Sequence, residues 1–380
     1  MADTTQQLRE ELFQELKKDP TSVAAVIEKL RQHTDEGLCV DPRNETLCFE
    51  TWLQVFALLH QNKLPHQAAE VVTAWYDRLN ELQAKNGNRY HKGGVAHNAG
   101  VCFFTLGDNT RGVWFYACAF TEDILSSANN DIPQTLASQH LRVHYNWSQT
   151  DFEAIATAAR ALKAAGGSLW HFPETTLVQL ARSQKLKIPL PRGGTDIPVN
   201  RPFLKQLIER LPAGDNNQKK ESLEFLASYL AVTLPGVRIN ANVKANANAA
   251  TFEHEIDLVV TQYGSTPTYL LEALGRHFLI ECKNWDSRVG AQALNHFVAK
   301  MRFHRCKCGV IFSREGLSGD ADQQTGLRFA RVTQLRWYQQ DDCVVIVITK
   351  QHLDELIAAG GSFSEALLHG YESVRFSSSN

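Results

Sequence analysis

Two short apolar segments, residues 253–261 and 276–284, place the strongest constraint on what this chain can fold into. Each is predicted to form a β-strand, in which successive side chains point to opposite faces. The first segment carries Asp257, and the second carries Glu281 and Lys283 on one face. If the two strands pair, these three side chains meet at one end of a small sheet. The sequence therefore predicts two neighbouring carboxylates with an ammonium group beside them.

This combination of side chains suits the hydrolysis of a phosphodiester. Two adjacent carboxylates repel each other and are costly to desolvate unless a cation lies between them, which favours a hard divalent metal such as Mg²⁺, with Mn²⁺ as a substitute. A bound metal polarises a phosphoryl oxygen, and Lys283 can orient the attacking water or stabilise the developing charge. The alternative is a pair of surface carboxylates and a solvated lysine at strand ends. The apolar residues around Glu281 favour the functional interpretation.

The order of these residues resembles the active-site pattern of the PD-(D/E)xK nuclease superfamily. Asp257 followed by Glu281-x-Lys283 matches its motif, although Ile256 replaces the usual proline. The surrounding residues, His254–Val260 and Ile280-Glu-Cys-Lys-Asn-Trp, are most similar to the Mrr-type branch of restriction endonuclease-like domains. The resemblance implies a DNA substrate, and it implies Asp257, Glu281 and the backbone carbonyl of Cys282 as metal ligands.

The resemblance also implies a role for two further polar residues. Related nucleases often carry an acid on the first helix that reaches the metal site, here Glu224, with Glu221 as an alternative on nearly the same face. Mrr-like domains often have a glutamine in the helix after the catalytic strand, here Gln292. A third acid, Glu255, shares the strand face of Asp257; it is either a direct metal ligand, a residue that supports the ligands, or an exposed strand-end acid. Both helix residues also have ordinary explanations, because polar groups favour a helix N-terminus without any function.

Basic side chains are concentrated after the catalytic strand. Such a cluster suits the phosphate backbone of a nucleic acid, although a solvated helix face gives the same pattern. The formal net charge of −2 is an average over the chain and does not exclude a local basic patch. The candidate nucleic-acid-binding residues are Arg288, Lys300, Arg302, Arg305 and Lys307.

The C-terminal part has the order of elements that the resemblance implies. We expect an α/β domain with a mixed central sheet, built as helix, three strands, helix and strand, followed by a further helix, strand and helix. The expected helices cover residues 221–234, 290–302, 322–335 and 352–358, and the expected strands cover residues 236–245, 253–261, 276–284, 308–313 and 343–349.

The N-terminal part is predicted to be entirely helical. Apolar residues recur at helical spacing over about the first 180 residues, and few runs alternate like strands. Residues 90–127 contain small and aromatic residues on either side of a turn at 106–109, which resembles a tetratricopeptide-type helical pair. We therefore expect a helical, repeat-like recruiting or regulatory domain at 1–184, a Pro- and Gly-rich linker with a short helix at 185–214, and the nuclease domain at 215–380.

The remaining expectations concern location and partners. The chain has no apolar run long enough to span a bilayer and begins with polar residues unlike a signal peptide, so we expect a cytoplasmic protein with no membrane contact. A protein or a ligand is expected to bind the helical domain, and a homodimer would allow both strands of a duplex to be cut. The family resemblance suggests prokaryotic defence against foreign DNA. The alternatives are a nuclease that acts on RNA or branched DNA, an inactive nuclease fold that only binds DNA, and a helical scaffold.

Overall fold

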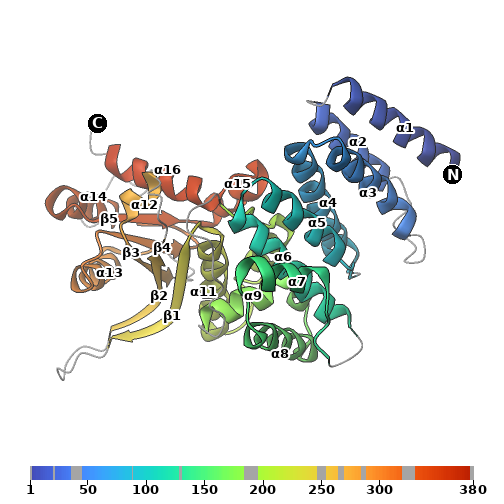
Figure 1. Ribbon diagram of the computed structural model, residues 1–380. Coiled ribbons are helices and arrows are strands. Elements are labelled where there is room, and N and C mark those ends of the chain that lie inside the picture. Colours follow the sequence, from blue (N-terminus) through green and yellow to red (C-terminus); the bar gives the residue numbers. More distant parts are fainter. Residues whose placement is uncertain are drawn as a thin grey trace. The chain divides into compact units, whose positions relative to one another are not determined.

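The computed structural model describes residues 2–19, 22–35, 45–87, 89–127, 131–183, 196–245, 254–263, 269–283, 288–318 and 330–376. The chain divides into two compact units, residues 1–147 and residues 148–380, which run from blue to green and from green to red in Figure 1. The functional boundary expected near residue 184 stays a prediction. The first part of the expected linker, residues 185–195, lies outside the described residues.

The N-terminal unit is helical, as predicted. Consecutive helices from α3 to α7 pack on one another. The turn between α5 and α6 contains Gly107 at φ 76°, and Asp108 caps α6 by accepting a hydrogen bond from the backbone N–H of Arg111. The described helices of this unit are α1 (Ala2–Lys18), α2 (Val23–Asp35), α3 (Glu45–Gln61), α4 (Pro65–Asn86), α5 (Gly93–Thr105), α6 (Asn109–Ser126) and α7 (Leu136–Tyr145). The repeat-like character of this unit stays a prediction.

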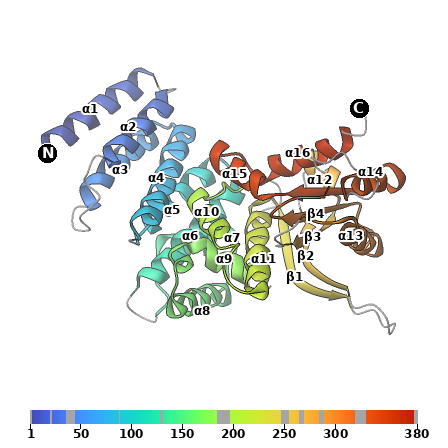
Figure 2. The ribbon, with the colours of Figure 1, turned by 180° about the vertical axis from the view of Figure 1, so that it is seen from behind.

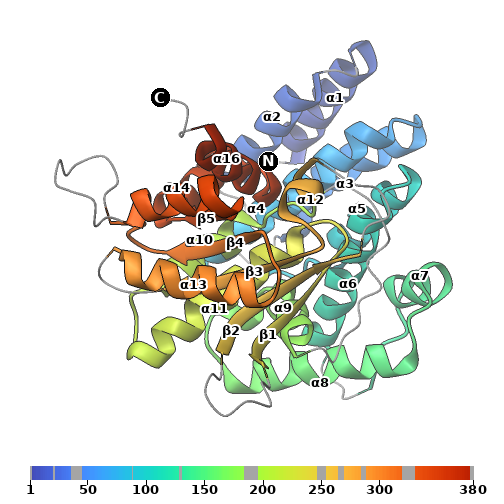
Figure 3. The same ribbon diagram turned by 90° about the vertical axis from the view of Figure 1, so that its left-hand side faces the viewer.

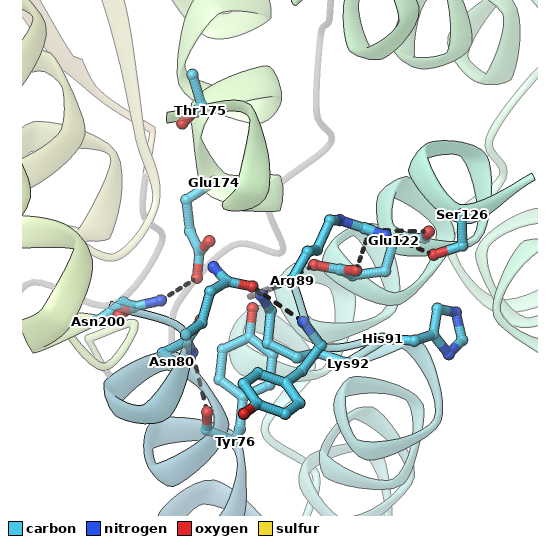
Figure 4. Close-up of polar contacts among 12 residues, drawn as sticks. Tyr76, Asn80, Arg89, His91, Lys92, Glu122, Ser126, Glu174, Thr175 and Asn200 are labelled. Carbon is cyan, nitrogen blue, oxygen red and sulfur yellow. Dashed lines mark hydrogen bonds and ion pairs between the residues drawn. The ribbon is translucent and has the colours of Figure 1, made fainter. Parts of the chain in front are cut away.

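A buried ionic cluster joins α4, α5 and α6. The side chains of Lys92 and Glu122 are both fully buried, and Lys92 Nζ lies 3.3 Å from Glu122 Oε1. Lys92 also donates a hydrogen bond of 2.8 Å to Gln83 Oε1. The guanidinium of Arg89 forms an ion pair with the other oxygen of Glu122 (Figure 4). Glu122 therefore supplies the negative charge for two neighbouring cations in a region from which water is excluded.

The C-terminal unit contains a five-stranded mixed sheet in the order β1-β2-β3-β4-β5. β1 and β2 pair in antiparallel orientation, as do β2 and β3, whereas β3, β4 and β5 are parallel. This confirms the predicted α/β domain with a mixed central sheet, and each expected strand falls on an observed one. The strands are β1 (Val237–Ala245), β2 (His254–Gln262), β3 (His277–Lys283), β4 (Cys308–Ser313) and β5 (Val344–Ile348).

Helices cover both faces of this sheet. α13 and α14 pack against one face, where Phe297, Met301 and Ile311 contribute to the core, whereas α11 packs against β1, β2 and β3 from the other side (Figures 1 and 3). α16 also packs on β5. Because helices cover both faces, every residue of β4 is buried. A strand buried on both faces needs apolar side chains on both, which explains the run Val310-Ile-Phe312.

The helices of the C-terminal unit differ from expectation in three places. The helix expected at 322–335 is observed at 330–341, and residues 322–329 lie outside the described part of the chain. Two described helices, α12 and α16, were not predicted. The helices are α8 (Gln149–Ala165), α9 (Pro173–Arg182), α10 (Arg201–Glu209), α11 (Asn216–Thr233), α12 (Tyr269–Leu274), α13 (Ala291–Phe303), α14 (Ala330–Asp341), α15 (Lys350–Ala359) and α16 (Phe363–Phe376). None of the described helices combines the length and the apolar character needed to cross a membrane.

Candidate active site

The hydrogen-bonded ladder between β2 and β3 stops just before the acidic residues. The last backbone pair is Leu258 with Ile280. One residue further along, a side chain replaces the backbone partner, because Oδ2 of Asp257 accepts a hydrogen bond of 2.7 Å from the backbone N–H of Cys282. β2 continues to pair with β1 beyond this point. The two central strands therefore separate where Asp257 and Glu281 lie across from each other.

Two lysines hold the carboxylate of Glu281. Lys283, on the same strand, places Nζ 2.8 Å from Oε1, and Lys300 of α13 places Nζ 2.8 Å from Oε2. Lys300 also donates a hydrogen bond of 2.7 Å to the backbone carbonyl of Glu255 on β2. α13 is thus tied to both strands at the point where they separate, and Glu281 has little freedom to turn away.

α11 brings a third carboxylate to the same place. The helix starts with a capping box in which Asp215 accepts from the backbone N–H of Gln218. Two turns later, Glu224 Oε1 lies 3.5 Å from Lys220 Nζ, and the same Nζ lies 3.4 Å from Asp257 Oδ1. Glu224 Oε2 lies 3.3 Å from a guanidinium nitrogen of Arg182 at the end of α9. Lys220 therefore bridges the acid of the helix and the acid of the strand.

Burial and mutual repulsion shape the electrostatics of this cluster. Asp257, Glu224 and Glu281 are only 4%, 4% and 5% exposed. Burial, and then the charge of Glu281, raise the pKa of Asp257 above its usual value. Burial, and then the charge of Asp257, raise the pKa of Glu224. Burial lowers the pKa of Lys220, but the surrounding carboxylates outweigh this effect and raise it. The three buried carboxylates are balanced by the four cations described above, Lys220, Lys283, Lys300 and Arg182.

The structure brings together four of the residues that the sequence selects. Asp257, Glu281, Lys283 and Glu224 lie in one cluster through the contacts described above. Of the two candidate helix acids, Glu224 is buried in the cluster and Glu221 is exposed. Cys282 contributes its N–H to Asp257, and a ligand role for its carbonyl stays a prediction.

Two other predicted residues lie outside this cluster. Gln292 is exposed in the first turn of α13, and within the described residues no hydrogen bond or ion pair joins it to the carboxylates. The side chain of Glu255 is 55% exposed, and its carboxylate lies 3.9 Å from Lys220 Nζ. Its position suits a residue at the rim of the cluster better than a buried ligand.

The five basic residues predicted to bind nucleic acid occupy different environments. Lys300 is engaged with Glu281, as described above. Lys307 pairs with Asp342 at 3.0 Å on the surface, and the guanidinium of Arg302 lies 5.5 Å from the ring centre of Trp337. Arg288 and Arg305 are exposed. A role for these residues in binding nucleic acid stays a prediction.

Sequence reasoning missed Lys220 and Arg182. Lys220 lies four residues before Glu224, so helical spacing alone could have placed the two on one face. Arg182 precedes Glu224 by 42 residues, and no local pattern connects them.

The donors of the cluster fit a hard divalent metal. All are oxygen atoms of buried carboxylates, and Mg²⁺ is commonly held by one or two carboxylates together with waters and substrate phosphate. Asp257 and Glu281 supply such a pair. Within the described part of the chain, no group of three or more His, Cys, Asp or Glu side chains is placed to hold a metal. The fit therefore rests on this pair, with Glu224 beside it.

The comparisons with known proteins agree with this geometry. Residues 236–339 match the Mrr_cat restriction endonuclease family. The match spans β1 to β4 and most of α14, so it includes Asp257, Glu281 and Lys283, whereas Glu224 and Arg182 lie before it. It identifies a restriction-endonuclease-like nuclease domain in the C-terminal unit. No match was found among curated proteins or among solved structures.

Metal binding at this site is expected to weaken as the pH falls. The pKa of Asp257 and that of Glu224 are raised, so these groups take up protons at a higher pH than exposed carboxylates do. A protonated carboxyl group is a poor metal ligand. Without metal, the raised pKa values also link these two carboxyl groups to folding stability. The protonated groups favour the folded state at low pH, and this contribution is lost as the pH rises through the raised pKa values.

Titration of the chain with Mg²⁺ between about pH 5 and about pH 8 tests this expectation. The apparent affinity should begin to decrease at a higher pH than the range in which exposed carboxylates titrate. An affinity that falls only within that ordinary range would contradict it.

Proposed function

We propose that the C-terminal unit is a metal-dependent endonuclease that hydrolyses phosphodiester bonds in DNA. The observation that carries the proposal is the pairing of buried Asp257 and Glu281 with Lys283 at the separated ends of β2 and β3, inside residues that match a restriction endonuclease family. A structural role alone would not require three carboxylates to be buried in one place, with burial and mutual repulsion raising the pKa of two of them, Asp257 and Glu224.

The residues divide the chemical work as follows. Asp257 and Glu281 would hold Mg²⁺, which would polarise the phosphoryl oxygen and lower the pKa of a bound water. Lys283 is fixed beside Glu281 and presents its ammonium group where negative charge develops on the phosphate. Lys300 keeps Glu281 oriented and fastens α13 to β2. Lys220 neutralises Glu224 and Asp257 until substrate and metal arrive.

The N-terminal helical unit is proposed to recruit or regulate the nuclease by binding a protein or a ligand. We extend the proposal to a cytoplasmic protein in a prokaryotic defence system, and to a homodimer if both strands of a duplex are cut. These further parts rest on the family resemblance and on the general use of helical surfaces for binding.

A substrate panel tests the proposed reaction. Purified full-length protein is incubated with plasmid, linear duplex DNA, single-stranded DNA and RNA in the presence of Mg²⁺, Mn²⁺ or a chelator. We expect cutting of DNA that stops in chelator. Cutting of RNA alone would replace DNA as the substrate. Binding of DNA without cutting in either metal would favour the inactive nuclease fold.

A further inference from the structure

A groove of about 750 Å³ lies next to the carboxylate cluster within the C-terminal unit. Its walls are formed by α9, by the end of α8 and the loop that follows, by the region from α10 to the middle of α11, and by Ala241 and Asn242 of β1. α9 packs beside α11 and β1, as Figure 2 shows for the two helices. Most of these elements precede residues 236–339, so the groove is largely an addition to the matched nuclease domain.

Two lining residues connect the groove to the proposed active site. Arg182 lines the groove and also lies 3.3 Å from Glu224. Asn242 of β1 lines it as well and stands opposite Asp257, because the neighbouring pairs of the ladder are Ala241 with Leu258 and Val243 with Ile256. The backbone of Asn242 has φ 51°, in the left-handed region that most residues avoid within a strand. The groove is therefore bordered by one residue that contacts Glu224 and one that lies opposite Asp257.

The lining has the chemistry of a nucleotide-binding surface. Arg182 and Arg210 provide guanidinium groups that match phosphate oxygens. Phe225 and Trp170 provide aromatic rings, and the guanidinium of Arg182 lies 5.8 Å from the ring centre of Phe225. The surrounding amide and hydroxyl side chains can donate and accept hydrogen bonds, and Glu221 is an acidic member of the wall. Both rings are half-buried, and cations beside aromatic rings are typical of sites where bases stack and phosphates are paired.

We propose that this groove binds an unpaired, single-stranded segment of the nucleic acid next to the phosphate that is cut. A paired base is stacked inside its duplex and offers no free face to Phe225 or Trp170, whereas an unpaired base does. The inference rests on the proposed function, since it names the form of substrate that the proposed active site receives. It predicts a preference for single strands, overhangs or flaps over blunt duplex.

Binding measurements in chelator test the groove without requiring cleavage. Fluorescence anisotropy with a labelled single-stranded oligonucleotide compares wild type with Arg210→Ala and Phe225→Ala. Each variant is expected to bind the single strand at least about fivefold more weakly. A loss of affinity of this size is expected when one stacked base or one phosphate contact is removed. Arg182 is left unchanged because it contacts Glu224.

A matched control removes the same charge elsewhere. Arg336 is an exposed residue of α14. α14 packs on the face of the sheet opposite to the one that α11 covers. Arg336→Ala should bind the single strand like wild type. All variants are first checked for wild-type thermal unfolding.

The outcomes separate this inference from the proposed function. Normal single-strand binding by both groove variants would overturn the inference even if the wild type cuts DNA. Weakened binding in both variants would support the inference even if the wild type cuts nothing. The absence of cutting would contradict the proposed function and not the inference.

Discussion

Replacement of Lys283 with alanine is expected to reduce the rate of DNA cleavage by about 100-fold to 1,000-fold, the usual effect of removing one group that stabilises transition-state charge. The ammonium group of Lys283 lies 2.8 Å from Glu281, and its side chain is 23% exposed, so it can face both the cluster and the substrate. Glu281 keeps its second partner, Lys300, in this variant. The fold should therefore persist while the chemistry is lost.

Single-turnover rates with Mg²⁺ measure this effect. The matched control is Lys350→Ala. Lys350 is a surface lysine whose side chain is 47% exposed, and its Nζ lies 2.6 Å from Asp354 Oδ2. This control should cut at the wild-type rate. A folded Lys283→Ala protein that cuts within about threefold of wild type would remove Lys283 from the mechanism.

Replacement of Glu122 with alanine should strongly destabilise the N-terminal unit. The change leaves fully buried Lys92 and the neighbouring Arg89 without their shared negative charge (Figure 4). Removing one member of a buried ion pair typically costs about 3–5 kcal/mol in the free energy of unfolding. For a unit of this size that cost corresponds to a fall of roughly 10 °C in melting temperature.

Thermal unfolding of the full chain, followed by circular dichroism, measures this loss. Glu70→Ala removes the same side chain from an exposed position on α4 and should change the free energy of unfolding by no more than about 0.5 kcal/mol. If the Glu122→Ala and Glu70→Ala proteins unfold at the same temperature, the buried cluster does not stabilise the unit as described.

The strands and the position of the site could be predicted because their signals are local. Short apolar runs mark β2 and β3, and the period of two of an extended strand places Glu281 and Lys283 on one face, close to Asp257 once the strands pair. The buried run of β5 was visible for the same reason. Short α12 carries too few residues for a helical period to appear, and its six residues gave no clear signal.

The environment of the site could not be predicted because it depends on contacts between distant residues. Arg182 and Glu224 meet only after α9 packs beside α11. The sequence placed Lys300 in a basic patch, yet it reaches Glu281 across the gap between helix and strand. Gln292 was selected by family resemblance alone; it is exposed in the first turn of α13, and its catalytic role stays a prediction.

The most direct test of the central claim compares DNA cleavage by wild type and by the double variant Asp257→Ala, Glu281→Ala, each with Mg²⁺ and with chelator. We expect the wild type to cut in Mg²⁺ only and the double variant, once shown to be folded, to cut nothing. Cutting by the folded double variant at the wild-type rate would contradict the assignment of these carboxylates as the catalytic centre, as would wild-type cutting that persists in chelator.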